Sequence, residues 1–156
     1  MAQKRKTDQS KLDAAAALLK KLEAETARDV KKRLSGNWRD NLFEIMMTRM
    51  DLAAKHKKTY AAIPSTLSHQ PQEIPKFAKR FLKTMHHMLK LAKAPASPLH
   101  VAAFSVLYAS VVNAFLNDVT KDRAKTMAAL DKGLSMFEQF ANCTCGKSQR
   151  QPDHRP

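Results

Sequence analysis

The sequence has few of the residues that tight turns and disulfide frameworks require. Only 3 glycines, 7 prolines and 2 cysteines occur among 156 residues. A β-sandwich needs many glycine-rich turns and a phosphate-binding loop needs clustered glycines, so the composition disfavours both. Two cysteines near one end cannot hold a disulfide framework together, and this usage is typical of a reduced, cytoplasmic protein.

Acidic residues are scarce beside basic ones. There are 14 Asp and Glu residues against 28 Lys and Arg residues, for a net charge of +14. Residues 73–97 carry 6 basic and 1 acidic residue, whereas residues 98–142 carry 4 of each. A high positive charge attracts polyanions but says nothing about fold. The neutral, apolar stretch 98–142 is therefore the segment best suited to meet a second copy of the chain without repulsion.

Long uninterrupted apolar runs are missing as well. The charged first residues lead into no apolar segment, so we expect no secretory signal. The most apolar run, Leu99 to Leu116, is interrupted by His100, Ser105 and Asn113. A membrane span needs about 20 predominantly apolar residues. We interpret this run as a buried helix and expect no transmembrane segment.

Apolar residues that recur every three or four positions predict an all-α bundle of five to six helices, because this spacing gathers them on one helix face. Asn37, Ser97 and Thr120 are the expected N-caps. We expect helices at about 10–33, 37–56, 74–92, 98–117 and 120–142, with a weaker one at 57–68. The expected organisation is a disordered basic tail (1–9), an N-terminal helix (10–36), a helical domain (37–142) and a second disordered tail (143–156).

No pattern in the sequence indicates catalysis or a metal site. No Ser/His/Asp order, carboxylate pair or phosphate loop is present, so we expect neither an enzyme nor a cofactor. Cys143 and Cys145 form a single C-x-C pair, whereas a zinc site needs about four ligands. His86 and His87 are adjacent and point about 100° apart on a helix, so they cannot grip one metal ion together.

Two features leave alternatives open. The eight methionines fill a core or line an adaptable pocket for an apolar molecule. The basic side of residues 76–93 is a solvated helix face or a contact for nucleic acid or an anionic membrane. Phe77 and Phe81 fall on the opposite, apolar side, which argues against a platform for stacked bases. The candidate polyanion contacts are Lys4, Arg5, Lys6, Lys31, Lys32, Arg33, Lys76, Lys79, Arg80 and Lys83.

Three stretches resemble the C-terminal domain of TetR-family regulators, in the subgroup related to the coenzyme Q accessory lipid-binding proteins. They are WRDNLFEIMMTRMDLAAKHKK, VAAFSVLYASVVNAFLND and TKDRAKTMAALDKGLSMFEQFA. The resemblance covers roughly residues 37–141. It rests on their order: a W-x₃-LFE opening at Trp38, an apolar helix ending in a polar turn, and a T-M-A-A-L-D run from Thr126 to Asp131.

The resemblance implies a ligand-binding and dimerisation domain whose last two helices pair with their mates in a four-helix bundle. The interface residues that it implies are Val101, Ser105, Ala109, Val112, Leu130, Leu134 and Phe137. The pocket residues that it implies are Phe43, Met46, Met47, Met50, Phe81, Met85, Phe104 and Tyr108.

The N-terminal region departs from the family pattern. The stretch SKLDAAAALLKKLEAE resembles the first helix of a helix-turn-helix, but the turn and the recognition helix that reads base edges are missing. We therefore expect a cytoplasmic homodimer that binds an apolar small molecule or lipid, in a regulatory or accessory role, without sequence-specific DNA reading. The alternatives are a basic nucleic-acid-binding regulator and an isoprenoid- or lipid-binding accessory protein of ubiquinone biosynthesis.

Overall fold

The chain folds as a bundle of α-helices, which confirms the predicted class. The structure, a computed structural model, describes residues 2–145 and the side chains of residues 6–144, and this part contains no strand. Two 3₁₀ turns, η1 (Ala54–His56) and η2 (Pro71–Glu73), flank the third helix. The helices are α1 (Ala2–Val30), α2 (Trp38–Ala53), α3 (Lys57–Ser68), α4 (Ile74–Ala92), α5 (Pro98–Asn117) and α6 (Ala124–Cys145).

Two of the three predicted N-cap residues cap the helices that they were expected to begin. The Asn37 side chain accepts a hydrogen bond of 2.9 Å from the Arg39 backbone N–H at the start of α2. The Ser97 hydroxyl accepts one of 3.5 Å from the His100 N–H, and proline follows at the first position of α5. These caps satisfy N–H groups that have no partner inside the helix.

The turn between α5 and α6 differs from the expectation that α6 begins at Thr120. Arg123 adopts a left-handed φ of 54°, and α6 starts at Ala124, whose N–H donates 3.1 Å to the Thr120 hydroxyl. Asp118, only 3% exposed, accepts from the backbone N–H groups of Thr120 (3.0 Å) and Thr126 (2.8 Å). Asp118 thus takes over part of the capping that the sequence assigned to Thr120.

The ends of the chain also differ from the expected tails. Residues 2–9 belong to α1 instead of a disordered tail, with Lys11 and Asp8 paired at 3.7 Å and Gln9 donating 3.2 Å to Asp13. Side-chain pairs three and four positions apart stabilise a helix. At the other end α6 continues to Cys145, and residues 146–156 lie outside the described part.

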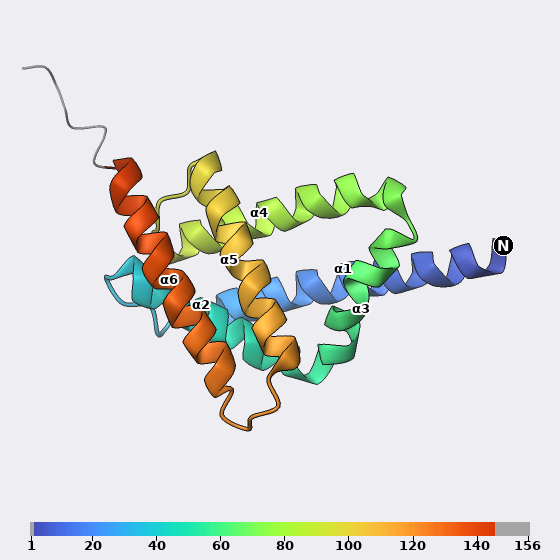
Figure 1. Cartoon of the computed structure of the whole chain (residues 1–156), viewed down its shortest axis with the longest axis horizontal. Helices are drawn as coiled ribbons and strands as arrows, with labels where there is room; N and C mark the ends of the chain where they lie inside the picture. The colour runs from blue at the N-terminus through green and yellow to red at the C-terminus, as the bar shows by residue number, and fades with distance from the viewer. Residues whose placement is uncertain (1, 146–156) are drawn as a thin grey trace, which may run out of the picture.

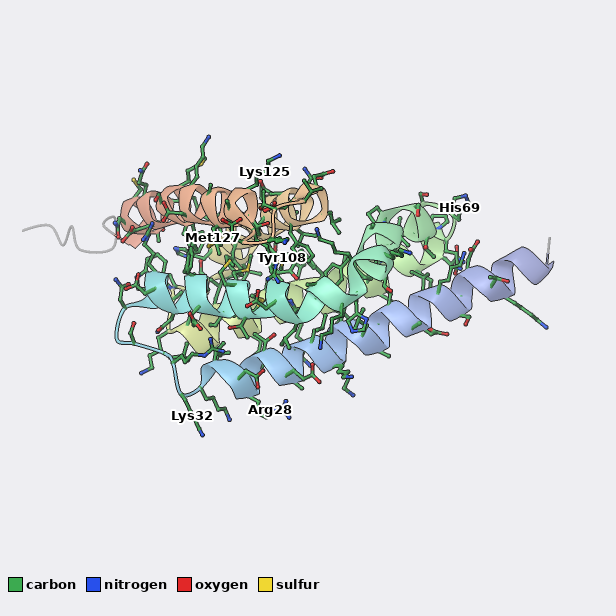
Figure 2. All side chains as sticks on the ribbon, turned by 90° about the horizontal axis from the view of Figure 1, so that it is seen from below. Arg28, Lys32, His69, Tyr108, Lys125 and Met127 are labelled. Atoms are coloured by element: carbon green, nitrogen blue, oxygen red, sulfur yellow. The ribbon has the colours of Figure 1, made fainter. Side chains whose placement is uncertain are left out.

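The helix α2 occupies the centre of the bundle. It contacts α1 on one side, α6 on another and also α4, while α5 and α6 pack side by side (Figure 1). Viewed at right angles, α6 and α1 lie on opposite sides of α2 (Figure 2). The core contains the largest fully buried side chains of these helices: Leu22, Val30, Leu42, Ile45, Met46, Met50, Met85, Leu89, Phe104, Phe115, Leu130 and Leu134.

Helix α5 is apolar almost all round. Within residues 2–145 it is the one helix long and apolar enough to cross a membrane by length and composition. Seven of its side chains, including those of Phe104 and Phe115, are buried in the bundle. This placement agrees with the interpretation as a core helix, and the described chain shows no clear transmembrane segment.

Candidate interaction surfaces

The residues implied as a ligand pocket come together in one place. Met46, Met50, Met85 and Phe104 have no exposed surface, and Tyr108 is 5% exposed. Phe43, Met47 and Phe81 are partly buried and pack against the same cluster. The Phe81 and Tyr108 rings meet edge to face with centroids 5.7 Å apart. Five of the eight side chains thus belong to the buried core cluster, and the other three pack against it.

Two hollows in the described part of the chain lie away from these residues. One, of about 10 Å³, is lined by residues of α1, α2 and α4 that include Glu23, Thr26 and Arg49. The other, of about 510 Å³, is an open surface hollow between the start of α1 and η2. Neither is lined by any of the eight implied pocket residues.

A buried arginine stands inside this apolar centre. Arg49 on α2 is 2% exposed, and its Nε donates a 2.8 Å hydrogen bond to the Tyr108 hydroxyl on α5. Burial lowers the pKa of the Arg49 guanidinium, but Tyr108, Tyr60 and Glu23 outweigh that effect and leave the pKa above its usual value. The side chain is therefore a permanent cation that links α2 to α5.

Tyr60 of α3 completes this buried cluster. It is 5% exposed, and its hydroxyl has no hydrogen-bond partner among the described residues. Burial is the largest cause that raises the pKa of Tyr60 far above its usual range, so the hydroxyl stays neutral. Arg49 was not among the residues predicted from the sequence. Its position, four residues after Ile45 and three after Met46, is nevertheless the spacing of the buried face.

Most of the implied interface residues lie inside the single chain. Leu130 and Leu134 have no exposed surface, Phe137 is 3% exposed and Val101 is 8% exposed. These side chains pack in the protomer core and are not available to a partner. Of the remaining implied residues, Ser105 and Val112 are partly buried and Ala109 is exposed.

Other apolar residues of the same two helices are exposed instead. Val106 is 73% exposed and Leu99 57% on α5, and Met136 is 63% exposed on α6. Ala102, also exposed, lies between Leu99 and Val106 at helical spacing. A Cβ on Gly133 would lie 3.0 Å from Leu107, so the glycine lets α5 and α6 approach closely. We call Leu99, Ala102, Val106 and Met136 the α5/α6 face.

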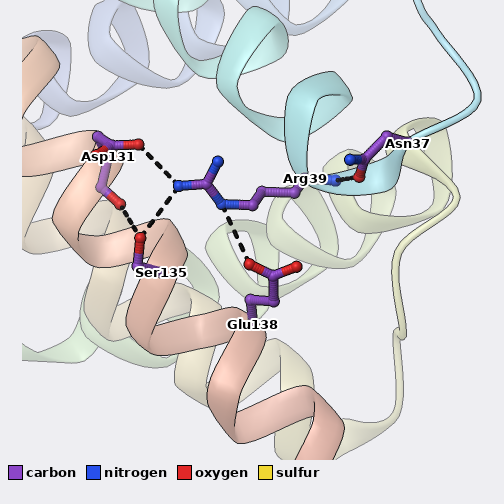
Figure 3. A network of polar contacts seen from close by, with 5 residues as sticks. All are labelled: Asn37, Arg39, Asp131, Ser135 and Glu138. Atoms are coloured by element: carbon purple, nitrogen blue, oxygen red, sulfur yellow. Dashed lines mark hydrogen bonds and ion pairs between the residues drawn. The ribbon is translucent and has the colours of Figure 1, made fainter.

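The side of α6 that faces α2 is occupied by an ion-pair network (Figure 3). Arg39 of α2 donates 2.8 Å to Asp131 and 3.1 Å to the Ser135 hydroxyl, and its Nε lies 3.3 Å from Glu138. Near the other end of α2, Asp51 pairs with Arg123. Because α6 is anchored to α2 in this way, the α5/α6 face is left free on the outside of the pair.

The candidate polyanion contacts do not form one patch. Lys6 lies near the start of α1 and Lys31 and Lys32 beyond its end, separated by a helix roughly 40 Å long. Arg33 is paired with Glu44 at 2.5 Å and Lys76 with Glu73 at 3.2 Å. The exposed α4 residues Lys79, Arg80 and Lys83 have no ion-pair partner among the side chains of residues 6–144. The side chains of Lys4 and Arg5 lie outside the described ones.

The described residues also include no group of three or more His, Cys, Asp or Glu side chains placed to hold a metal ion. Cys143 is exposed and unpaired, and the side chain of Cys145 is outside the described set. No protein-family model, no curated protein and no solved structure matches the chain.

Proposed function

We propose that this chain is a non-enzymatic self-association module in which two copies pair through the α5/α6 face. The observation that carries this proposal is the exposure of Val106 and Met136, 73% and 63%, on adjacent core helices. Large apolar side chains gathered on one face of a folded protein mark interaction sites more often than free surface. Two copies of a helix pair meeting on this face form a four-helix arrangement.

Charge supports a second copy as the partner. The whole chain carries +14, so two copies repel each other over most approaches. Residues 98–142 are neutral by count, and α5 contains no Asp, Glu, Lys or Arg. Pairing through this region is the approach with the smallest electrostatic cost. It also agrees with the resemblance to TetR-type domains, in which the last two helices pair.

A ligand role receives less support than pairing. Met46, Met85 and Phe104 are fully buried members of the core cluster, so an apolar molecule reaches them only if core side chains move apart. Buried side chains are close-packed, and separating them removes many dispersion contacts. Pairing needs no such rearrangement, because the face is already exposed.

The test is Val106→Glu, compared with Val119→Glu as a matched control. Val119 is 90% exposed in the turn between α5 and α6, away from the proposed face. A carboxylate buried without a partner costs about 3 kcal/mol or more, which weakens a dimer roughly 100-fold. Analytical ultracentrifugation over a concentration series measures this dissociation constant.

We expect a dimer for the wild-type chain and for Val119→Glu, and a monomer with unchanged helical content for Val106→Glu. Even a weak homodimer forms at a protein concentration of roughly 100 micromolar. A wild-type chain that sediments as a monomer at this concentration contradicts the proposal. Equal dissociation constants for all three proteins place the interface elsewhere.

A further inference from the structure

The outward side of α4 carries exposed cations that the fold does not neutralise. Lys79, Arg80 and Lys83 are exposed and have no ion-pair partner within residues 6–144. They lie within about one turn of the helix. The nearest acidic residue along the chain is Glu73, which already holds Lys76 at 3.2 Å. Three like charges kept together without a counter-ion destabilise the free protein slightly and favour a polyanion.

Helix α1 adds to this charge. Glu23 of α1 accepts 3.1 Å from the Thr84 hydroxyl and lies 2.7 Å from the His87 Nδ1, so the middle of α1 lies beside α4. One helical turn earlier on each helix stand Lys20 and Arg80, both exposed. The Glu23 carboxylate is held by α4 itself, so it does not pair with these two cations.

The open hollow continues the surface at the start of α4. It has a volume of about 510 Å³ and lies between α1 and the residues that precede α4. Its lining contains no carboxylate and consists of Lys6, Gln9, His69, Gln70, Pro71 and Gln72. Anionic oxygens therefore meet no carboxylate in the hollow itself, and the exposed Asp13, one turn further along α1, accepts a hydrogen bond from Gln9.

We propose that α4 and the first part of α1 form a docking surface for the phosphate backbone of double-stranded nucleic acid, bound without regard to base sequence. Lys and Arg side chains that replace counter-ions on phosphates supply this kind of affinity. The contact set consists of Lys20, Lys79, Arg80 and Lys83.

The geometry favours a duplex over a membrane as the partner. A helix that lies on a membrane buries its apolar face in lipid. The apolar face of α4 is used inside the bundle, where Met85 and Leu89 are fully buried. The exposed Leu82 lies about 60°, 100° and 160° around the helix from Lys79, Lys83 and Arg80, so it borders the cationic side at Lys79 and lies away from its centre.

The test is fluorescence anisotropy of the full chain with a labelled duplex of random sequence, at several salt concentrations. The variant changes Lys79, Arg80 and Lys83 to Gln. The matched control changes the exposed Lys55, Lys58 and Lys121 to Gln, which lowers the net charge equally. None of the six residues has an ion-pair partner among the side chains of residues 6–144, so circular dichroism and melting temperature should not change.

We expect the wild-type chain and the control to bind, and the α4 variant to bind at least 10-fold more weakly at low salt. The plot of log K against log salt should also become shallower by about 3, since each lost phosphate contact removes about 0.9 from the slope. An equal loss in the control overturns the proposal, because general charge then explains binding. Absence of binding at low salt overturns it too, as does binding to phosphatidylglycerol vesicles alone.

Discussion

The two sides of the bundle use opposite kinds of surface. The α5/α6 side is neutral by count over residues 98–142 and exposes Val106 and Met136. The α1/α4 side exposes Lys20, Lys79, Arg80 and Lys83 near Glu23, which is already hydrogen-bonded. Separation of this kind lets one molecule pair with its own copy on one side and leave the other free for a polyanion.

On the α5/α6 side, some apolar side chains are buried in the protomer and others are exposed to solvent. Leu130 and Val106 both belong to the apolar pattern of the last two helices, yet Leu130 has no exposed surface and Val106 is 73% exposed. Leu130 therefore stabilises the protomer, whereas Val106 is available to a partner. Substitutions at buried and exposed positions should differ accordingly in their effect on stability.

Leu130→Ala should destabilise the protomer without affecting the α5/α6 face. Removing a fully buried leucine costs about 4 kcal/mol, because transfer energy is lost and a cavity remains. Thermal unfolding followed by circular dichroism should show a fall of roughly 12 °C for a chain of this length. Val106→Ala should leave the protomer melting temperature nearly unchanged, and a fall as large as that of Leu130→Ala would erase the distinction.

Arg49→Ala tests how the α5/α6 side and the α1/α4 side are connected. Arg49 of α2 is hydrogen-bonded to Tyr108 of α5 and interacts electrostatically with Glu23 of α1. Truncation leaves the Tyr108 hydroxyl without its donor and opens a cavity, at a cost of about 3 kcal/mol in urea unfolding. Arg49→Met retains most of the volume without a buried charge and should cost less than half as much. An equal loss for Met and Ala would show that the guanidinium and its hydrogen bond to Tyr108, rather than side-chain volume, stabilise the core.

Asp118→Asn tests the turn between α5 and α6. The Thr120 side chain, at 2.5 Å, is the largest cause that holds the pKa of Asp118 well below its usual range, and the Thr126 and Thr120 N–H groups add to it. A lowered pKa stabilises the fold above the unfolded-state value near pH 4, and this stability is lost as the pH falls further.

The wild-type chain should therefore melt higher than Asp118→Asn from pH 8 to 5, and the gap should narrow below about pH 4. Glu23→Gln is the counterpart on the basic side, where the carboxylate binds the exposed His87. Its effect at neutral pH should be smaller, because solvent screens exposed pairs. If the difference in melting temperature between the wild-type chain and Asp118→Asn stayed constant down to pH 2, the role assigned to the Asp118 carboxylate would be wrong.

Arg39→Gln should give only a small change, although its network joins α2 to α6 (Figure 3). The Arg39 side chain is 26% exposed, and partly solvated pairs contribute about 1 kcal/mol. Arg33→Gln, which removes the more exposed pair with Glu44, should cost still less. Both effects should shrink in 0.5 M salt, roughly where the screening length is a few ångströms. A loss that salt does not change would indicate packing by the Arg39 stem.

The class of fold and the positions of most helices follow from local sequence patterns. Three- and four-residue spacing predicts helices directly, and the caps at Asn37 and Ser97 depend on neighbouring backbone groups alone. The unequal charge of α4 and α5 can also be read directly from the sequence. The start of α6 at Ala124 could not, because it depends on Asp118 and on the left-handed Arg123.

The side of each apolar helix that faces inward depends on how the helices pack against one another. Helix α5 is apolar almost all round, so its pattern does not distinguish Phe104, which is fully buried, from Val106, which is exposed. The choice depends on where α2, α4 and α6 pack against it. The same packing buries Arg49 beside Tyr108 and fills the place where the resemblance implied a pocket. Periodicity is a property of one helix, whereas burial is a property of the helices around it.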